Sequence, residues 1–208
     1  MGDGTAKAGV KRAREEMYRR LVLEAAEAVF ARQGYDAARI QDIAAEAGIS
    51  LGTLYSVFPG KWEVYRAVHD ARGEELLATA AEVVGRSAGT LDLLVDGIRG
   101  YVCYLIDHPN YLRMHLREGY SWAASGQYRS GEQIHAWEQG IALTAALFAQ
   151  GQREGVIVRG DPPLLAKMMA AVQQVQLADW VDGGMKTPPD EVIGRIQDHF
   201  RRAFVVQN

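Results

Sequence analysis

Residues 39–61 read RIQDIAAEAGISLGTLYSVFPGK, and the spacing within this stretch decides the local fold. It predicts two short helices that cross closely, because Ala44 and Ala45 are small and Gly48 permits the positive φ of a tight turn. Ser50 follows the turn, where its hydroxyl can accept a backbone N–H at the start of the second helix. The facing sides carry apolar residues that predict a small shared core: Ile40, Ile43, Ala47, Ile49, Leu54 and Val57. This arrangement is typical of helix-turn-helix motifs, which place their second helix in a major groove of DNA.

The rest of the chain repeats its apolar residues with helical period, so we predict an all-α fold of about nine helices. An N-terminal arm and a three-helix domain with the helix-turn-helix would occupy residues 1–60, and a C-terminal helical domain residues 61–208. Outside the motif, helices are expected over about 11–33, 60–84, 90–107, 109–119, 128–154, 161–181 and 188–206. The run VIV at 156–158 is the one β-like stretch, and we expect it to be too isolated to pair.

Composition argues against several other classes of protein. No run approaches the roughly 20 apolar residues needed to cross a bilayer, and residues 1–20 lack the apolar centre of a signal peptide. Cys103 is the one cysteine and cannot form an internal disulfide, which favours a cytoplasmic protein. The histidines lack metal-ligand spacing, and the GxSxG, Walker A, HExxH and dinucleotide-binding glycine motifs are absent. We therefore expect no metal, no cofactor, no membrane contact and no enzymatic activity.

The distribution of charge adds weak evidence for a nucleic-acid partner. The net charge is −3, but residues 1–20 carry six basic and three acidic side chains. A basic patch of this kind can steer a protein toward phosphates. The arm could also enter a minor groove, although we favour a solvated, disordered tail. Its basic residues are Lys7, Lys11, Arg12 and Arg14.

Residues 21–66 resemble the TetR family of bacterial transcriptional regulators. The matching motif elements are Phe30…Gly34-Tyr35, Ile43-Ala44…Ala47-Gly48-Ile49-Ser50, Gly52-Thr53-Leu54-Tyr55 and Phe58…Lys61. The resemblance implies a homodimer whose second motif helices enter successive major grooves of a near-palindromic, double-stranded DNA operator. It also implies a small-molecule effector that binds the body and alters the affinity for DNA.

The resemblance further implies a set of DNA-binding residues. Tyr55 would contact a phosphate through its hydroxyl, Lys61 would pair with a phosphate, and Gln41 would reach a base edge or the backbone. The reading helix would run from Ser50 to Ser56. The full set is Arg39, Gln41, Ser50, Leu51, Gly52, Thr53, Tyr55, Ser56 and Lys61.

The chain departs from the family pattern at three positions. Arg39 replaces a frequent Ser or Thr, so it can bind phosphate by charge but cannot cap a helix. Leu51 replaces a frequent polar residue and can touch a thymine methyl group instead. Val57 replaces a Tyr or His that often binds phosphate. Specificity for a particular operator would depend on these departures.

The C-terminal part is rich in aromatic and polar-tipped residues at helical spacing. Ligand pockets are mostly apolar with a few orienting polar groups, so these residues are candidates for an effector site. For each of them, ordinary core packing is at least as good an interpretation. The candidates are Tyr101, Tyr104, Tyr111, Met114, His115, Trp122, His135, Trp137, Phe148, Met168, Val172 and Gln176.

The last two predicted helices have apolar faces that could pair across a two-fold axis into a four-helix bundle. Small alanines in the first of them would permit close approach. The predicted interface residues are Leu165, Met169, Val175, Ile193, Ile196, Phe200 and Phe204. If this assignment holds, a charge at Phe200 should dissociate the dimer.

Taken from sequence, the best hypothesis is a ligand-responsive repressor released from its operator by a small apolar or aromatic molecule. The main alternative is a dimeric DNA-binding activator or architectural protein that needs no ligand.

Overall fold

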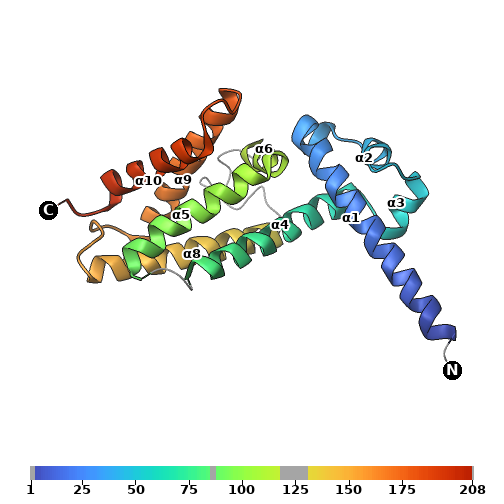
Figure 1. Ribbon diagram of the computed structural model, residues 1–208, viewed down its shortest axis with the longest axis horizontal. Helices are drawn as coiled ribbons and strands as arrows, with labels where there is room; N and C mark the ends of the chain where they lie inside the picture. Colours follow the sequence, from blue (N-terminus) through green and yellow to red (C-terminus); the bar gives the residue numbers. More distant parts are fainter. Residues whose placement is uncertain (1–2, 85–87, 118–130, 208) are drawn as a thin grey trace. The chain divides into compact units, whose positions relative to one another are not determined.

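The computed structural model describes residues 3–84, 88–117 and 131–207, and the side chains of 8–83, 88–117 and 138–207. Within these residues the chain forms nine α-helices, which confirms the all-α prediction (Figure 1). The helices are α1 (Asp3–Ala37), α2 (Ile40–Glu46), α3 (Leu51–Val57), α4 (Lys61–Val84), α5 (Thr90–Asp107), α6 (Pro109–Arg117), α8 (Gly131–Arg153), α9 (Pro162–Asp182) and α10 (Pro189–Phe204). No helix among the described residues is long and apolar enough to cross a membrane.

The chain divides into two compact units, Met1–Arg72 and Gly73–Asn208. The division falls inside α4, later in the chain than the boundary expected between residues 60 and 61.

The N-terminal unit packs α1, α2, α3 and the first turns of α4 around one small core. Its fully buried side chains include Val29, Phe30, Ile43, Leu54 and Val64. α1 bends at Gly34, whose φ of 77° is left-handed, so this glycine interrupts the helix directly after residue 33, where the first helix is predicted to end.

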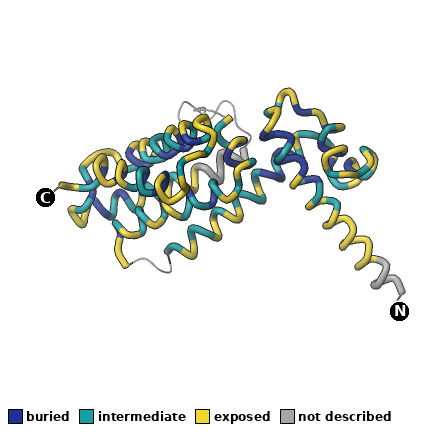
Figure 2. The backbone as a smooth tube through the Cα atoms, turned by 45° about the horizontal axis from the view of Figure 1, so that its top comes forward, coloured by how far each residue is buried: buried dark blue, intermediate teal, exposed yellow. Residues whose placement is uncertain are grey.

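The basic arm is helical, and the expectation of a disordered tail is wrong for its described backbone. α1 begins at Asp3, and the Lys11–Glu15 pair supports its exposed turns through an i, i+4 contact of 3.7 Å. Residues 8–17 are all exposed, which is visible as the outer turns of α1 in Figure 2.

The C-terminal unit packs the remainder of α4 with α5, α6, α8, α9 and α10. Leu105, Leu112, Phe148 and Leu177 are completely buried at its centre. Phe148 meets Phe200 and Phe204 edge to face, with ring centroids 6.2 and 5.5 Å apart. These ring contacts join α8 to α10.

The prediction that VIV at 156–158 does not pair is wrong. Ile157 forms an isolated antiparallel bridge with Val205, just after α10. Val158 N–H donates to the Phe204 carbonyl at 2.9 Å, and Val206 N–H donates to the Val156 carbonyl at 3.0 Å. The pairing was missed because the partner lies at the far end of the chain and has no alternating pattern of its own.

Candidate functional site

The connection between α2 and α3 has the geometry that the sequence predicts. Gly48 adopts a φ of 66°, and Ile49 N–H donates to the Ala44 carbonyl at 3.0 Å. Ser50 Oγ accepts the backbone N–H of Thr53 at 3.0 Å, which confirms the predicted cap of α3. Arg39 precedes α2 and makes no side-chain cap, as expected from its chemistry.

α3 presents one buried and one exposed side. Leu54 is completely buried, whereas the neighbouring Tyr55 is 48% exposed. Three residues of the predicted DNA-binding set, Leu51, Thr53 and Lys61, are half-buried. The exposed members are Arg39, Gln41, Ser50, Gly52, Tyr55 and Ser56. Their exposure is compatible with DNA contact, and their role remains a prediction.

Hydroxyl groups tie together the backbone of α3. Ser50 Oγ and Thr53 Oγ1 share a hydrogen bond of 2.8 Å, and Ser56 Oγ donates to the Thr53 carbonyl at 2.6 Å. These contacts fix the first turn of the helix. Within the predicted set, the long exposed side chains are those of Arg39, Gln41 and Tyr55.

Lys61 has a different environment from the one predicted for a phosphate ligand. Its ammonium group donates to carbonyl oxygens of the α1–α2 connection at 2.7 to 3.3 Å. These contacts compete with the expected phosphate contact, which stays a prediction. The sequence could not show these contacts, because the acceptors lie 23 to 26 residues earlier in the chain.

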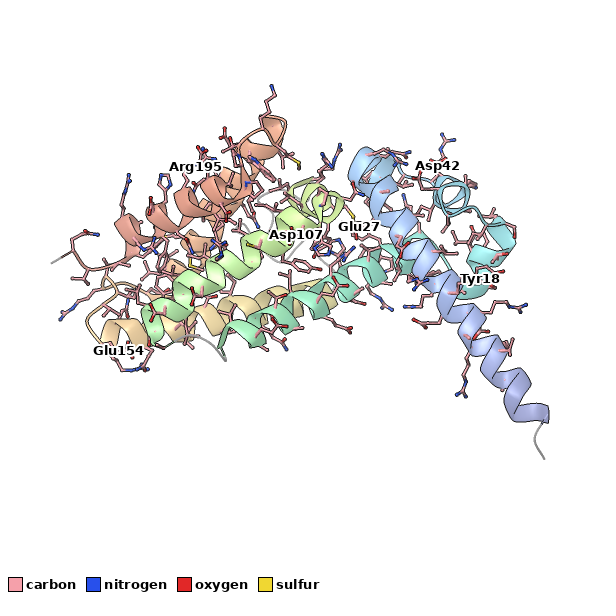
Figure 3. The ribbon with its side chains drawn as sticks, viewed as in Figure 1. Tyr18, Glu27, Asp42, Asp107, Glu154 and Arg195 are labelled. Carbon is pink, nitrogen blue, oxygen red and sulfur yellow. The ribbon has the colours of Figure 1, made fainter. Side chains whose placement is uncertain are left out.

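A buried ion pair joins α1 to α4 within the N-terminal unit. Arg72 Nε donates to Glu27 Oε2 at 2.7 Å, and Glu27 is only 8% exposed. Figure 3 labels Glu27 on α1. No sequence pattern indicates this pair, because its partners are 45 residues apart.

The predicted effector-binding residues fall into different environments. Tyr104, Tyr111, Met114 and Phe148 are buried, while Tyr101, His115, Val172 and Gln176 are half-buried. Met168 is 48% exposed on the outer side of α9, so its assignment to an interior pocket is wrong. Trp122 lies outside the described residues, as do the side chains of His135 and Trp137.

Two of the predicted residues meet around one imidazole. His115 Nε2 lies 3.0 Å from the Tyr101 hydroxyl and 3.1 Å from Gln174 Nε2. Tyr111 places its ring centroid 6.2 Å from that of His115. We call Tyr101, Tyr111, His115 and Gln174 the imidazole cluster; it joins α5, α6 and α9.

Sequence reasoning named Gln176 and missed Gln174. Gln174 is 5% exposed and lies on the inner side of α9. An amide within an otherwise apolar helix face costs free energy unless it is hydrogen-bonded, so the interruption of that face was the available sign.

Tyr104 and Phe148 are better described as structural residues. The Tyr104 hydroxyl donates to Glu75 Oε2 at 2.6 Å, and its ring packs on His108 at a centroid distance of 4.2 Å. Phe148 belongs to the aromatic core with Phe200 and Phe204. Val172 borders a gap among α5, α9 and α10 that is too narrow to hold even a water molecule.

The predicted dimer interface needs a larger correction. Ile193, Ile196, Phe200 and Phe204 are at most 2% exposed, because the apolar stripe of α10 packs into its own unit. Leu165 is buried as well, and Met169 is half-buried. Of the predicted set, only Val175 is well exposed, at 49%.

The outer side of α9 carries several apolar residues that are exposed among the described side chains. Leu164 and Met168 are 54% and 48% exposed, in line with Val175 along the helix. Ala171 and Ala178 occupy the positions between and beyond them and are half-buried. We call these five residues the α9 stripe: Leu164, Met168, Ala171, Val175 and Ala178.

No group of three or more His, Cys, Asp or Glu side chains in the described part of the chain is placed to hold a metal. Cys103 is half-buried on α5, and burial raises the pKa of its thiol. A thiol with a raised pKa is a poor nucleophile at neutral pH.

Residues 22–68 match the model of the bacterial regulatory proteins of the tetR family. Over 176 residues the chain is 28% identical to the A-factor receptor protein of Streptomyces griseus, an alignment that covers 84% of this chain and 59% of that protein. It is 29% identical over 160 residues to an HTH-type transcriptional repressor of Streptomyces coelicolor, covering 76% and 75% of the two chains.

The fold agrees with solved structures. The ketosteroid transcriptional regulator KstR2 of Mycobacterium tuberculosis superimposes with a TM-score of 0.76 and 22% identity, covering 91% of this chain and 95% of that one. Residues 22–68 therefore match the N-terminal domain of the TetR family, and the chain as a whole resembles regulators of that family. The curated relatives that it matches are transcriptional regulators and not enzymes.

Proposed function

We propose that the protein is a homodimeric repressor that leaves a near-palindromic operator when a small apolar or aromatic molecule binds its C-terminal unit. The observation that carries this proposal is the capped α3, which buries Leu54 and exposes Tyr55, while Gln41 of α2 is exposed as well. A rigid helix with one polar exposed side suits entry into a major groove.

Each exposed side chain has a role in this proposal. Tyr55 donates its hydroxyl to a phosphate, Gln41 reaches a base edge or the backbone, and Arg39 attracts a phosphate by charge. Leu51 packs against a thymine methyl group. A Cβ at Gly52 would meet only Ser50 Oγ, at 3.8 Å, so packing around the described residues does not require glycine there. The missing side chain permits close approach of DNA to the backbone of α3.

The α9 stripe supports association with a second copy. An exposed apolar face along a helix is best covered by a partner, and a two-fold axis would pair the stripe with itself. The outer side of α10 adds charges of both signs from Glu191, Arg195 (labelled in Figure 3), Asp198 and Arg202. Opposite charges on one face can pair reciprocally across the axis.

The imidazole cluster supports the effector site. His115, Tyr101 and Gln174 offer both hydrogen-bond donors and acceptors within a largely apolar unit, which is the composition of most ligand sites. Among similar proteins, one is named a receptor for A-factor and another a ketosteroid regulator. These names are in line with a small-molecule effector for this chain as well.

The proposed release is a shift between two arrangements of the dimer. In one arrangement, the two N-terminal units do not have the half-site spacing of about 34–36 Å that successive major grooves require. An effector that binds this arrangement better lowers the affinity for DNA.

A two-part experiment tests the function. A library of apolar and aromatic compounds is screened for those that raise the melting temperature, since a ligand of the native state stabilises it. Each hit is then added to the complex with a duplex that the protein has selected from a random pool. We expect at least one hit to release the DNA. Hits that leave DNA binding unchanged, or a protein that no compound stabilises, would favour the ligand-independent alternative.

A further inference from the structure

Lys61 begins α4, and its ammonium group is occupied by the chain itself. Nζ donates to the carbonyl oxygens of Tyr35 at 2.7 Å, Asp36 at 3.3 Å and Ala38 at 3.0 Å. An ammonium group has three N–H donors, so these contacts engage all of them. Nζ also lies 4.3 Å from the centroid of the Tyr35 ring, within the range of a cation–π interaction.

These carbonyl oxygens need a donor because of how α1 ends. The chain leaves the helical path at Gly34, with φ 77° and ψ 167°, and carbonyl groups at the C-terminal end of a helix lack intrahelical partners. The same end carries the negative pole of the helix dipole, which favours a cation. Lys61 supplies that cation from the start of another helix.

Aromatic rings reinforce the same junction. Tyr35 lies 4.8 Å from Tyr65 and 6.0 Å from Trp62 between ring centroids, and Phe30 lies 5.1 Å from Tyr65. Burial raises the pKa of Tyr35, as do the nearby carboxylates of Asp36 and Glu63, so its phenol is neutral at physiological pH. We call Lys61 with its three carbonyl partners and the rings of Tyr35, Trp62 and Tyr65 the α1–α4 clasp.

The clasp closes the segment that contains the helix-turn-helix. α2 and α3 lie in sequence between Ala38 and Lys61, so both ends of this segment are held at one point of the N-terminal unit. We propose that Lys61 is a positioning residue for DNA reading, which fixes the orientation of α3 through the α1–α4 clasp and does not bind a phosphate. This inference rests on the proposed role of α3 in reading DNA.

A positioning residue and a phosphate ligand have different consequences for DNA binding. Loss of a phosphate contact weakens specific and non-specific binding alike and reduces the salt slope by about 0.9 per phosphate, or about 1.8 for the two copies in a dimer. Loss of a positioning residue weakens specific binding alone and leaves the salt slope unchanged, because α3 no longer fits the bases.

The test compares Lys61→Met with Lys186→Met in the full-length protein. Lys186, in the connection between α9 and α10, is a matched control because its replacement removes the same charge from the other unit. Both are titrated, below their melting temperatures, with a duplex selected by the unaltered protein and with a scrambled duplex of equal length. We expect Lys61→Met to lose at least about tenfold on the selected duplex and less than about twofold on the scrambled one, with an unchanged salt slope.

A comparable loss on both duplexes with a reduced slope would show a phosphate ligand and overturn the inference, as would full affinity of the variant. If Lys61→Met does not fold, Lys61→Arg replaces it. Arginine keeps the charge, but its planar fork cannot direct three donors to converging carbonyls, so we expect lower discrimination. Unchanged discrimination in Lys61→Arg would contradict the clasp.

A measurement on the free protein separates this inference from the proposed function. The carbonyl ¹³C shifts of Tyr35, Asp36 and Ala38 should change in Lys61→Met and stay constant in Lys186→Met. Constant shifts in both variants would refute the clasp whatever the protein does with DNA. An unaltered protein that prefers no selected duplex would refute the proposed function instead.

Discussion

The helix-turn-helix and the pair α9–α10 both carry apolar stripes, but the two regions differ in what covers them. In α3, Leu54 faces the core of its own unit and the opposite side is polar. In α9, apolar residues occupy both sides, so Leu177 is completely buried while Val175 is 49% exposed. α10 resembles α3, because its apolar stripe is buried and its outer side is charged.

The difference shows what hydrophobic period does and does not determine. A stripe predicts that a helix face is covered, yet it does not say whether the same chain or a partner covers it. In α3 and α10, which each have a single apolar side, that side packs into the core of the same unit. The surplus apolar side of α9 is therefore the candidate for association.

The largest loss of stability is expected from substitutions of Phe200. They distinguish a core role of the α10 stripe from a role in the dimer interface. Phe200→Ala should lower the free energy of unfolding by about 3–5 kcal/mol, because a buried ring of the aromatic core is lost. Phe200→Asp should prevent the C-terminal unit from folding, as measured by circular dichroism. A well-folded, monomeric Phe200→Asp protein would restore the dimer-interface interpretation.

A smaller and more selective effect is expected on the α9 stripe. Val175→Asp should weaken the dimer about 30-fold, equivalent to about 2 kcal/mol, and leave the fold of each protomer intact. Sedimentation velocity over a concentration series measures this change. Leu143→Asp on α8 is the control, since Leu143 is 50% exposed but lies on another helix. Equal weakening by both variants would count against the stripe.

Within the N-terminal unit, the Glu27–Arg72 pair should matter more than an exposed pair. Removal of one partner of a fully buried pair costs about 3–5 kcal/mol, and because the Arg72 side chain is 21% exposed, we expect about 2 kcal/mol for Glu27→Ala. Glu46→Ala, which breaks the exposed Arg32–Glu46 pair, should cost less than about 1 kcal/mol. Urea unfolding of both variants checks the order, and a reversed order would contradict the burial argument.

The smallest effect concerns pH and Glu154, which follows α8 and is labelled in Figure 3. Hydrogen bonds from Gln150 and Thr90 lower the pKa of Glu154 below its ordinary value of 4.5. A lowered folded-state pKa stabilises the protein above the unfolded-state value, and this contribution is lost as the pH falls through the folded-state value. Between pH 6 and pH 3, the melting temperature of Glu154→Gln should therefore fall slightly less than that of the unaltered protein. Parallel curves would remove Glu154 from the acid response.

Local chemistry accounts for most of what the sequence could predict. Gly34, Gly48 and Ser50 act within a few residues of themselves, so their turn and cap roles follow from backbone geometry. The roles of Lys61 and Gln174 depend on partners from other helices, between 23 and 59 residues away. No local pattern encodes such contacts, which is why a phosphate ligand was expected where the structure has a clasp.

The same limit applies to the candidate sites. The exposed side of α3 was predictable, because a short helix with one buried leucine has one remaining side. The sequence predicts part of the imidazole cluster. Aromatic spacing indicates Tyr101 and His115 as candidates, but Gln174 comes close to them only in the folded chain.

The central claim is that the exposed side of α3 and Gln41 of α2 read DNA, and equilibrium titration tests it most directly. The unaltered protein and the double variant Gln41→Ala/Tyr55→Ala are each titrated with the selected and the scrambled duplex. We predict that the unaltered protein prefers the selected duplex by about 10³ or more, and that the double variant loses at least about tenfold of this preference with an unchanged melting temperature. Equal preference in the two proteins, or no preference in the unaltered one, would contradict the account.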